Sequence, residues 1–231
     1  MSQVKIVPIP VAMGPMNVMA YLLVGERVVV VDTGVAGQEG RILDAVRAEG
    51  RAPADVSLIL LTHGHGDHAG SADALRTATG APIALGAGDE EKCLHGRDTE
   101  MRARGAFART ALAAIRKRQA GGPPNPGPVP DLIFDAERSL QEYGVDAVAV
   151  PSPGHTRGSL SVFTASGDAL VGDLLGGGGR SRTSPARGVF VCDEEAMEAS
   201  IREVIARGPR LVHTGHDRGP FTLKQLTEAF A

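Results

Sequence analysis

The sequence is poor in aromatic residues, in cysteine and in long apolar runs. Aromatic residues make up 3% of the 231 positions and tryptophan is absent, so few side chains are available to stack on nucleic-acid bases. No apolar run approaches the roughly 20 residues that a membrane span needs. The net charge of −3 gives no general attraction to nucleic acid or to anionic lipid. We therefore expect neither a nucleic acid nor a membrane as a partner.

The two cysteines, Cys93 and Cys192, are too few to form a disulfide framework. Free thiols are typical of proteins in a reducing compartment, and the first residues lack the long apolar stretch of a secretory signal. These features predict a cytoplasmic protein. We expect a small molecule as the substrate, and a second copy of the chain is a candidate partner.

The most informative segment is His-Gly-His-Gly-Asp-His at residues 63–68. Its three imidazoles and one carboxylate are ordinary ligands of Zn²⁺. Both interposed residues are glycine, which lets the backbone bend so that the side chains converge. Residues 57–62 form a short apolar run that predicts a buried strand. The segment therefore follows the carboxyl end of a strand, where the sites of layered α/β proteins tend to lie.

Three further ligand-type residues follow apolar runs later in the chain, and each comes directly after a glycine. They are His155, Asp173 and His216. We expect them to gather with the 63–68 segment at one edge of the sheets. The predicted ligands of a first metal ion are His63, His65 and His155. Those of a second ion are Asp67, His68 and His216, with Asp173 as a bridge between the two ions.

Two divalent metal ions would give the chain a nucleophile without any serine or cysteine. We predict Zn²⁺ at both positions, with Fe or Mn as alternatives. Ions about 3.5–4 Å apart share a hydroxide and polarise a carbonyl oxygen, and Asp67 is the candidate for proton transfer. Asp32, after the Val28–Val31 run, is predicted to hold a ligand imidazole or the metal-binding loop by a hydrogen bond. A local Asx turn is the alternative for Asp32.

Strand runs and single helices alternate along the chain, which predicts two mixed β-sheets between layers of helices. Helices are expected at 39–49, 71–79, 100–119, 194–206 and 223–230. Strands are expected at 4–7, 19–24, 28–31, 57–62, 82–85, 132–134, 147–150, 160–164, 169–171 and 211–214. Residues 89–128 are rich in Arg, Ala and Glu and end in a run of Gly and Pro. We interpret them as a helical, Pro-rich insertion in a single domain that spans 1–231.

These residues, in this order, resemble the metallo-β-lactamase superfamily, in particular its glyoxalase II-like and lactonase-like members. The resemblance extends from Asp32-Thr33-Gly34 through the 63–68 segment to the three later ligands. It implies an α/β fold, a four-layer αββα sandwich of two mixed β-sheets flanked by helices, with the metal site at one sheet edge. It also implies a metal-dependent hydrolase that cleaves a small ester, thioester or lactone with a metal-bridging hydroxide.

Departures from the family pattern disfavour some of the reactions that members of the family catalyse. Asp173 and the lack of a secretion signal disfavour antibiotic hydrolysis, and no tyrosine follows Asp173 as it does in the familiar lactonases. A glycine run follows instead, and then Arg180 and Arg182, which are candidates for gripping a carboxylate or phosphate of the substrate. Two alternatives stay open: a mononuclear iron oxidoreductase similar to persulfide dioxygenases, and a phosphodiesterase or nuclease.

Overall fold

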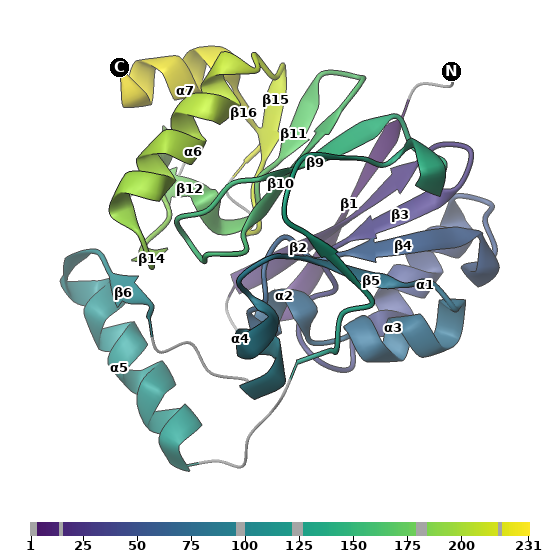
Figure 1. Cartoon of the computed structure of the whole chain (residues 1–231), viewed down its shortest axis with the longest axis horizontal. Coiled ribbons are helices and arrows are strands. Elements are labelled where there is room, and N and C mark those ends of the chain that lie inside the picture. Colours follow the sequence, from purple (N-terminus) through teal and green to yellow (C-terminus); the bar gives the residue numbers. More distant parts are fainter. Residues whose placement is uncertain (1–3, 14–15, 96–99, 122–126, 179–183, 217–218) are drawn as a thin grey trace.

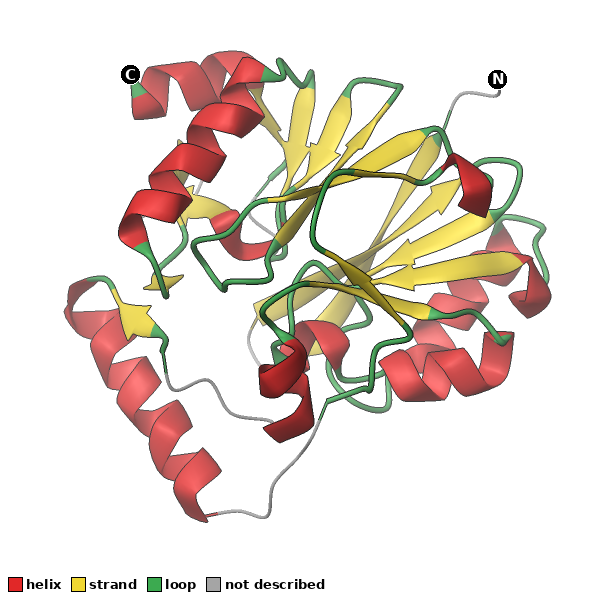
Figure 2. Ribbon diagram, viewed as in Figure 1, coloured by secondary structure: helices red, strands yellow, loops and turns green. Residues whose placement is uncertain are grey.

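Two β-sheets face each other in the middle of the molecule, and helices cover their outer faces (Figure 1, Figure 2). The computed structural model describes residues 4–13, 16–95, 100–121, 127–178, 184–216 and 219–231. The first sheet has the spatial order β1 (Lys5–Met13), β2 (Met16–Val24), β3 (Val28–Val31), β4 (Val56–Leu60), β5 (Ile83–Gly86) and β7 (Leu132–Phe134). The second has the order β16 (Phe221–Thr222), β15 (Leu211–His213), β11 (Asp168–Leu170), β10 (Leu160–Thr164), β9 (Ala147–Pro151) and β8 (Arg138–Ser139).

Shorter elements complete the described part of the chain. The helices are α1 (Glu39–Ala48), α2 (Gly66–Ala69), α3 (Ala72–Thr79), α4 (Glu90–His95), α5 (Gly105–Gly121), α6 (Glu194–Ala206) and α7 (Leu223–Phe230). Single 3₁₀ turns are η1 (Pro53–Asp55), η2 (Gln141–Tyr143) and η3 (Gly172–Leu174). Two small strand pairs join β12 (Leu175–Gly178) to β13 (Ser184–Arg187) and β6 (Arg102–Ala103) to β14 (Phe190–Val191). No helix in these ranges is long and apolar enough to cross a lipid bilayer.

Strand β3 is valine throughout because both of its faces are buried. Val29 and Val31 belong to the apolar layer between the two sheets, whereas Val28 and Val30 pack in the layer beneath α1 and α3. Alternate side chains of a strand point to opposite faces, so a strand covered on both sides needs apolar residues at every position. Its neighbour β4 shows the same complete burial.

A third apolar layer lies between the second sheet and the helices α6 and α7. It contains Val212 and Ala169 from the sheet and Met197, Ile201 and Leu226 from the helices. The layers therefore follow the order helix, sheet, sheet, helix, and both sheets mix parallel and antiparallel pairs. The predicted αββα sandwich is confirmed.

Strand β1 is longer than the sequence predicts, because it continues through two prolines to Met13. Pro8 lies opposite Tyr21 and Pro10 lies opposite Met19 in the antiparallel pair with β2. Proline lacks the N–H that a ladder requires, and for this reason it is confined to edge strands. As β1 pairs with β2 alone in its sheet, it tolerates both residues.

The insertion also differs from its predicted form. Its long helix begins at Gly105, which has a φ of +79°, rather than at residue 100. The preceding Arg102 and Ala103 are extended because they pair with Val191 and Phe190. The glycine run after Asp173 contributes the strand β12, although glycine has low strand propensity. Both differences arise from strand pairing: β6 pairs with the distant β14, and β12 pairs with β13, the next strand along the chain.

Truncation of Leu58 tests how much the apolar layer between the sheets stabilises the fold, because this side chain is fully buried there. We expect Leu58→Ala to lower the free energy of unfolding by about 3 kcal/mol, since the truncation leaves a cavity. Val189 is 54% exposed, and Val189→Ala should change the same quantity by less than about 0.5 kcal/mol. Urea denaturation of the three proteins measures both values. Equal losses in the two variants would contradict this account of the core.

Candidate metal centre

All seven predicted ligands meet at one edge of the two sheets. The potential ligand atoms form three groups, each within 4.8 Å: His63, His65 and His155; His63, His68 and Asp173; Asp67, His68 and His216. The 63–68 loop follows β4 of the first sheet. The other three residues come from the second sheet, after β9, β11 and β15. The centre is therefore assembled across the contact between the sheets.

The first group consists of three imidazoles in close contact. The Nδ1 atom of His65 lies 3.0 Å from the Nε2 atom of His155. The ring of His63 lies nearly perpendicular to both, with its centroid 4.7 Å from that of His65 and 4.6 Å from that of His155. Nitrogens that converge in this way have room for one cation between them, and three imidazoles are a common zinc ligand set.

Asp173 lies between the first group and the second. Its Oδ2 atom is 3.2 Å from Nε2 of His216 and 3.8 Å from Nε2 of His155, and its Oδ1 atom is 3.5 Å from Nε2 of His68. The Oδ2 atom of Asp67 is 3.9 Å from Nε2 of both His68 and His216. The two oxygens of Asp173 thus face both groups, which is the placement that a bridging carboxylate requires.

Four of the histidines are held by hydrogen bonds at Nδ1, so their Nε2 atoms face the centre. The acceptors are Thr62 Oγ1 for His63 (3.0 Å), Asp32 Oδ2 for His68 (2.9 Å), Phe190 O for His155 (2.9 Å) and Asn17 O for His216 (3.2 Å). Such acceptors hold the proton on Nδ1 and leave the lone pair of Nε2 for a metal ion.

Asp32 makes the contact that the sequence predicts for it. Its buried carboxylate accepts hydrogen bonds from His68 Nδ1, from the backbone N–H of Thr62 (2.7 Å) and from the hydroxyl of Thr62 (2.8 Å). The residue has a φ of +60°, a conformation that costs about 1–3 kcal/mol and persists where the surroundings impose it. The carboxylate thus fixes both a predicted ligand and the start of the metal-binding loop.

Three polar atoms in the centre have no hydrogen bond within the described part of the chain. They are Nε2 of His63, Nε2 of His68 and Oδ1 of Asp173, and all three are buried. Burial of a polar atom without a partner costs free energy, and a divalent ion would give each of these atoms a partner. The donor set of imidazole nitrogens and carboxylate oxygens fits a pair of zinc or iron ions.

The first group favours neutral imidazoles. Burial lowers the pKa of His155 to about 4. Burial and the neighbouring His68 hold the pKa of His63 well below its ordinary value. Neutral imidazole is the form that binds a metal ion, so His63 and His155 are ready for ligation at neutral pH.

The two imidazoles of the second group, His68 and His216, have raised pKa values and favour the protonated form. Burial opposes the charge on His68, but the carboxylates of Asp173 and Asp32 outweigh it and raise its pKa to about 10. Asp173 likewise raises the pKa of His216 to about 9, against the effect of burial. Two imidazolium ions therefore occupy the place where the second metal ion would lie.

Asp89 is a functional candidate that the sequence did not reveal. Its fully buried carboxylate accepts hydrogen bonds from the Gly64 N–H (2.8 Å), the Thr156 hydroxyl (2.7 Å), the Gly158 N–H (3.1 Å) and the Lys92 ammonium (3.0 Å). It therefore ties the metal-binding loop to the loop that carries His155. In sequence it stands beside two glutamates at the start of the insertion, where a charge run predicts a solvated surface.

The glycine before a predicted ligand is required by crowding in at least two cases. A Cβ atom on Gly215 would lie 2.4 Å from Oδ1 of Asp173 and 2.7 Å from Cε1 of His68. Gly172 has a φ of +52°, and a Cβ atom there would lie 2.7 Å from Oγ1 of Thr62. These positions exclude a side chain because the ligands are packed against the backbone.

Strand β2 holds the loop that carries His216. The hydroxyl of Tyr21 donates to the carbonyl of Thr214 (2.7 Å), and the N–H of Met19 donates to the carbonyl of Gly215 (2.8 Å). These bonds join the first sheet to the last ligand of the second. Tyr21 is thus a structural tyrosine whose hydroxyl is occupied away from the centre.

Arg180 and Arg182 fall outside the described residues, so their role stays a prediction. Arg187, which follows them, pairs with Glu198 of α6. Cys93 is buried and Cys192 is half-buried, and neither forms a disulfide.

Comparison with known proteins decides the family. The model of the metallo-beta-lactamase superfamily matches residues 13–216. The chain belongs to the metallo-beta-lactamase superfamily. A probable metallo-hydrolase of Bacillus subtilis, YqgX, is 28% identical over 214 residues, which cover 90% of this chain and 88% of that protein. The resemblance that the sequence motifs predicted is confirmed.

Solved structures of the superfamily share the fold. The B3 metallo-beta-lactamase BLEG-1 superposes with a TM-score of 0.69 at 24% identity, over 97% of each chain. The protein TTHA1623, in a di-iron-bound form, superposes with a TM-score of 0.64 at 25% identity, over 95% of this chain and 97% of that one. The superfamily fold thus extends over nearly the whole of this chain.

Asp89→Ala tests the connection between the two loops. We expect the variant to bind zinc about 10–100-fold more weakly, because residues that orient metal ligands contribute that much to affinity. Competition with a chromogenic chelator measures the affinity. Asp44→Ala removes an exposed carboxylate on α1 and should leave it unchanged. Equal affinities in the two variants would show that Asp89 does not position the ligands.

Proton release tests the charge of the second group. Near about pH 7.5 the imidazoles of His68 and His216 carry protons, because their pKa values of about 10 and about 9 lie above that pH. Ligation needs the neutral form, so zinc binding should release about two protons per chain from these imidazoles, besides any proton lost by a metal-bound water. Calorimetry of the chelator-stripped protein in buffers of different ionisation enthalpy measures the number. His216→Ala should release one fewer, and binding without proton release would refute the assignment.

Proposed function

We propose that this protein is a dinuclear metal-dependent hydrolase that cleaves a small ester, thioester or lactone. The observation that supports it best is the place of Asp173, whose two oxygens face both groups of ligand atoms. Membership of the superfamily supports a metal-dependent enzyme. The complete second group favours two ions over the single iron of a persulfide dioxygenase-like oxidoreductase.

Each residue of the centre has a part in this proposal. His63, His65 and His155 would hold one ion, and Asp67, His68 and His216 the other. When bound, a pair of divalent ions supplies Lewis acidity and a water molecule of lowered pKa. Zn²⁺ is the proposed metal on the chemistry of the donors, and iron is the alternative, which the di-iron form of TTHA1623 supports.

Asp67 is the proposed proton acceptor. Its side chain is 29% exposed, whereas that of His68 is fully buried. A carboxylate at the open side of the centre can exchange protons with solvent between turnovers, which a buried ligand cannot do. General acid–base catalysis of this kind contributes about 10²–10⁴-fold to a rate.

The proposal extends to the partners and the location of the protein. A small molecule in the cytoplasm is the proposed substrate, rather than a nucleic acid or a lipid surface. The low aromatic content and the net charge of −3 support this choice. A homodimer is the proposed alternative to a monomer.

Metal analysis joined to a substrate panel tests the proposal. We expect about two zinc or iron ions per chain, and turnover of at least one of p-nitrophenyl acetate, an acetyl thioester and a γ-lactone. About one iron per chain with thiol-dependent oxygen uptake would overturn it in favour of the oxidoreductase. Cleavage of bis-p-nitrophenyl phosphate alone would overturn it in favour of the phosphodiesterase.

The variant His65→Ala tests whether the predicted metal ligands are needed for hydrolysis. We expect kcat/KM for the accepted ester to fall by at least about a hundredfold, because loss of a ligand should exceed the effect of losing a residue that orients one. Circular dichroism should show an unchanged fold. His95→Ala makes the same change at an exposed histidine that pairs with Glu91 and should keep full activity. Undiminished turnover by His65→Ala would defeat the mechanism.

A further inference from the structure

The second part of the insertion carries charge of one sign only. Residues 101–130 contain six cationic side chains and no aspartate or glutamate. The cations are Arg102, Arg104, Arg109, Arg116, Lys117 and Arg118. The chain as a whole carries a net charge of −3, so the positive charge is concentrated in this one segment. Concentrated charge of one sign raises the local concentration of ligands of the opposite sign.

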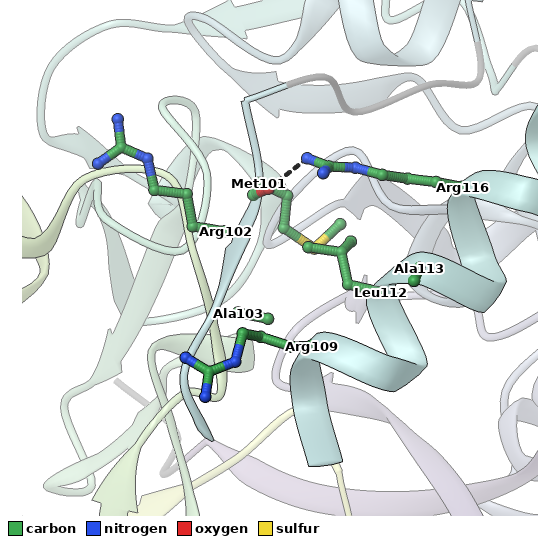
Figure 3. Close-up of a pocket in the computed structure, with 7 residues that line it drawn as sticks. All are labelled: Met101, Arg102, Ala103, Arg109, Leu112, Ala113 and Arg116. Atoms are coloured by element: carbon green, nitrogen blue, oxygen red, sulfur yellow. Dashed lines mark hydrogen bonds between the residues drawn. The ribbon is translucent and has the colours of Figure 1, made fainter. Parts of the chain in front are cut away.

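A hollow of about 630 Å³ lies between β6 and α5, within this segment (Figure 3). Its apolar lining comes from Met101, Ala103, Leu112 and Ala113. Three arginines, Arg102, Arg109 and Arg116, line it as well. A volume of this size is typical of small-molecule sites, which join an apolar wall to a few polar groups.

The arginines of the hollow lack the carboxylate partners that neighbouring arginines have. Arg104 pairs with Glu194 and Arg187 pairs with Glu198. Within the described ranges, no carboxylate lies at ion-pair distance from Arg102 or Arg109. Arg116 donates to the backbone carbonyl of Met101 at 2.7 Å, as Figure 3 shows. Arg109 therefore has its positive charge left for an anion from solution, whereas the side chain of Arg102 points away from α5 in Figure 3.

The hollow is connected to the metal centre through a pair of strands. Ala103, on its wall, lies opposite Phe190 in the β6–β14 pair. Paired strands are about 4.8 Å apart, and the carbonyl of Phe190 accepts the Nδ1 hydrogen bond of His155 at 2.9 Å. Next to the hollow, Glu100 binds the guanidinium of Arg157 through two hydrogen bonds of 2.8 and 3.0 Å. A predicted ligand is thus only one strand away from the wall of the hollow.

We propose that this hollow binds the anionic end, a carboxylate or a phosphate, of the substrate whose acyl group reaches the metal centre. The inference rests on the proposed hydrolase function and names the substrate class. The arginines bind the anionic oxygens, because guanidinium groups match carboxylate and phosphate geometry. The apolar lining contacts the short carbon chain between the anionic end and the reacting carbonyl.

Two esters of equal chain length separate this specificity from hydrolysis itself. The probes are p-nitrophenyl hemiglutarate, which ends in a carboxylate, and neutral p-nitrophenyl valerate. We expect the wild-type kcat/KM to favour the hemiglutarate, and Arg109→Gln to lower that preference by roughly fivefold, the worth of a partly exposed ion pair. The preference should also decline as salt is added.

Lys117→Gln is the matched control, because it removes one charge from the same helix at an exposed residue outside the hollow. Its preference should equal that of the wild type. A preference that Arg109→Gln leaves unchanged, or that Lys117→Gln lowers equally, would overturn the proposal, since the effect would then belong to the overall charge.

Calorimetry with glutarate and with butyl phosphate distinguishes the two anions and separates the two proposals. Binding of either anion that weakens in Arg109→Gln but not in Lys117→Gln supports the hollow, even if the wild type cleaves neither ester and the hydrolase proposal fails. Ester hydrolysis with no binding of either anion and no preference for hemiglutarate refutes the hollow and leaves the hydrolase intact. The absence of both binding and hydrolysis refutes both.

Discussion

The centre depends on several imidazoles that are buried close together. Each buried ring nitrogen needs a hydrogen bond, a nearby carboxylate or a metal ion as its partner. Asp173 and Asp32 make this crowding tolerable in the metal-free chain, because their carboxylates face His68 from both sides. The same two contacts raise the pKa of His68 and fix its ring. The carboxylates that balance the charge of His68 are thus also the ones that orient it. The carboxylates offset the repulsion between the imidazoles, which lie close together.

Short-range patterns in the sequence predict much of the fold and of the ligand set. The 63–68 segment follows an apolar strand run, and the later ligands each follow another, so strand ends predict their meeting place. The glycine before His216 is a local signal as well, and its cause is the contact with Asp173. Asp32 was found because it ends an apolar run beside a turn. Alternation and strand ends are short-range features, and for this reason both the layers and the predicted ligands could be inferred.

Other features depend on contacts between distant residues, and a single sequence does not show them. Asp89 is one carboxylate in an acidic run, and only the folded chain reveals its bonds to Gly64 and Thr156. The β6–β14 pair joins two segments of only two residues each, which are too short for a window of the sequence to predict. The sequence predicts a strand only over 4–7, whereas β1 continues through Pro8 and Pro10 to Met13 because an edge strand accommodates proline.

The division of the centre between the two sheets has a consequence for how the protein is made. The 63–68 loop leaves the ribosome long before His216, which comes 148 positions after His68 (216 − 68). A nascent chain that ends before β15 holds the first group of ligands but not the second, since His216 has yet to be synthesised. The two positions therefore become available one after the other during translation. The second position is therefore completed only when β15 and the loop after it have docked.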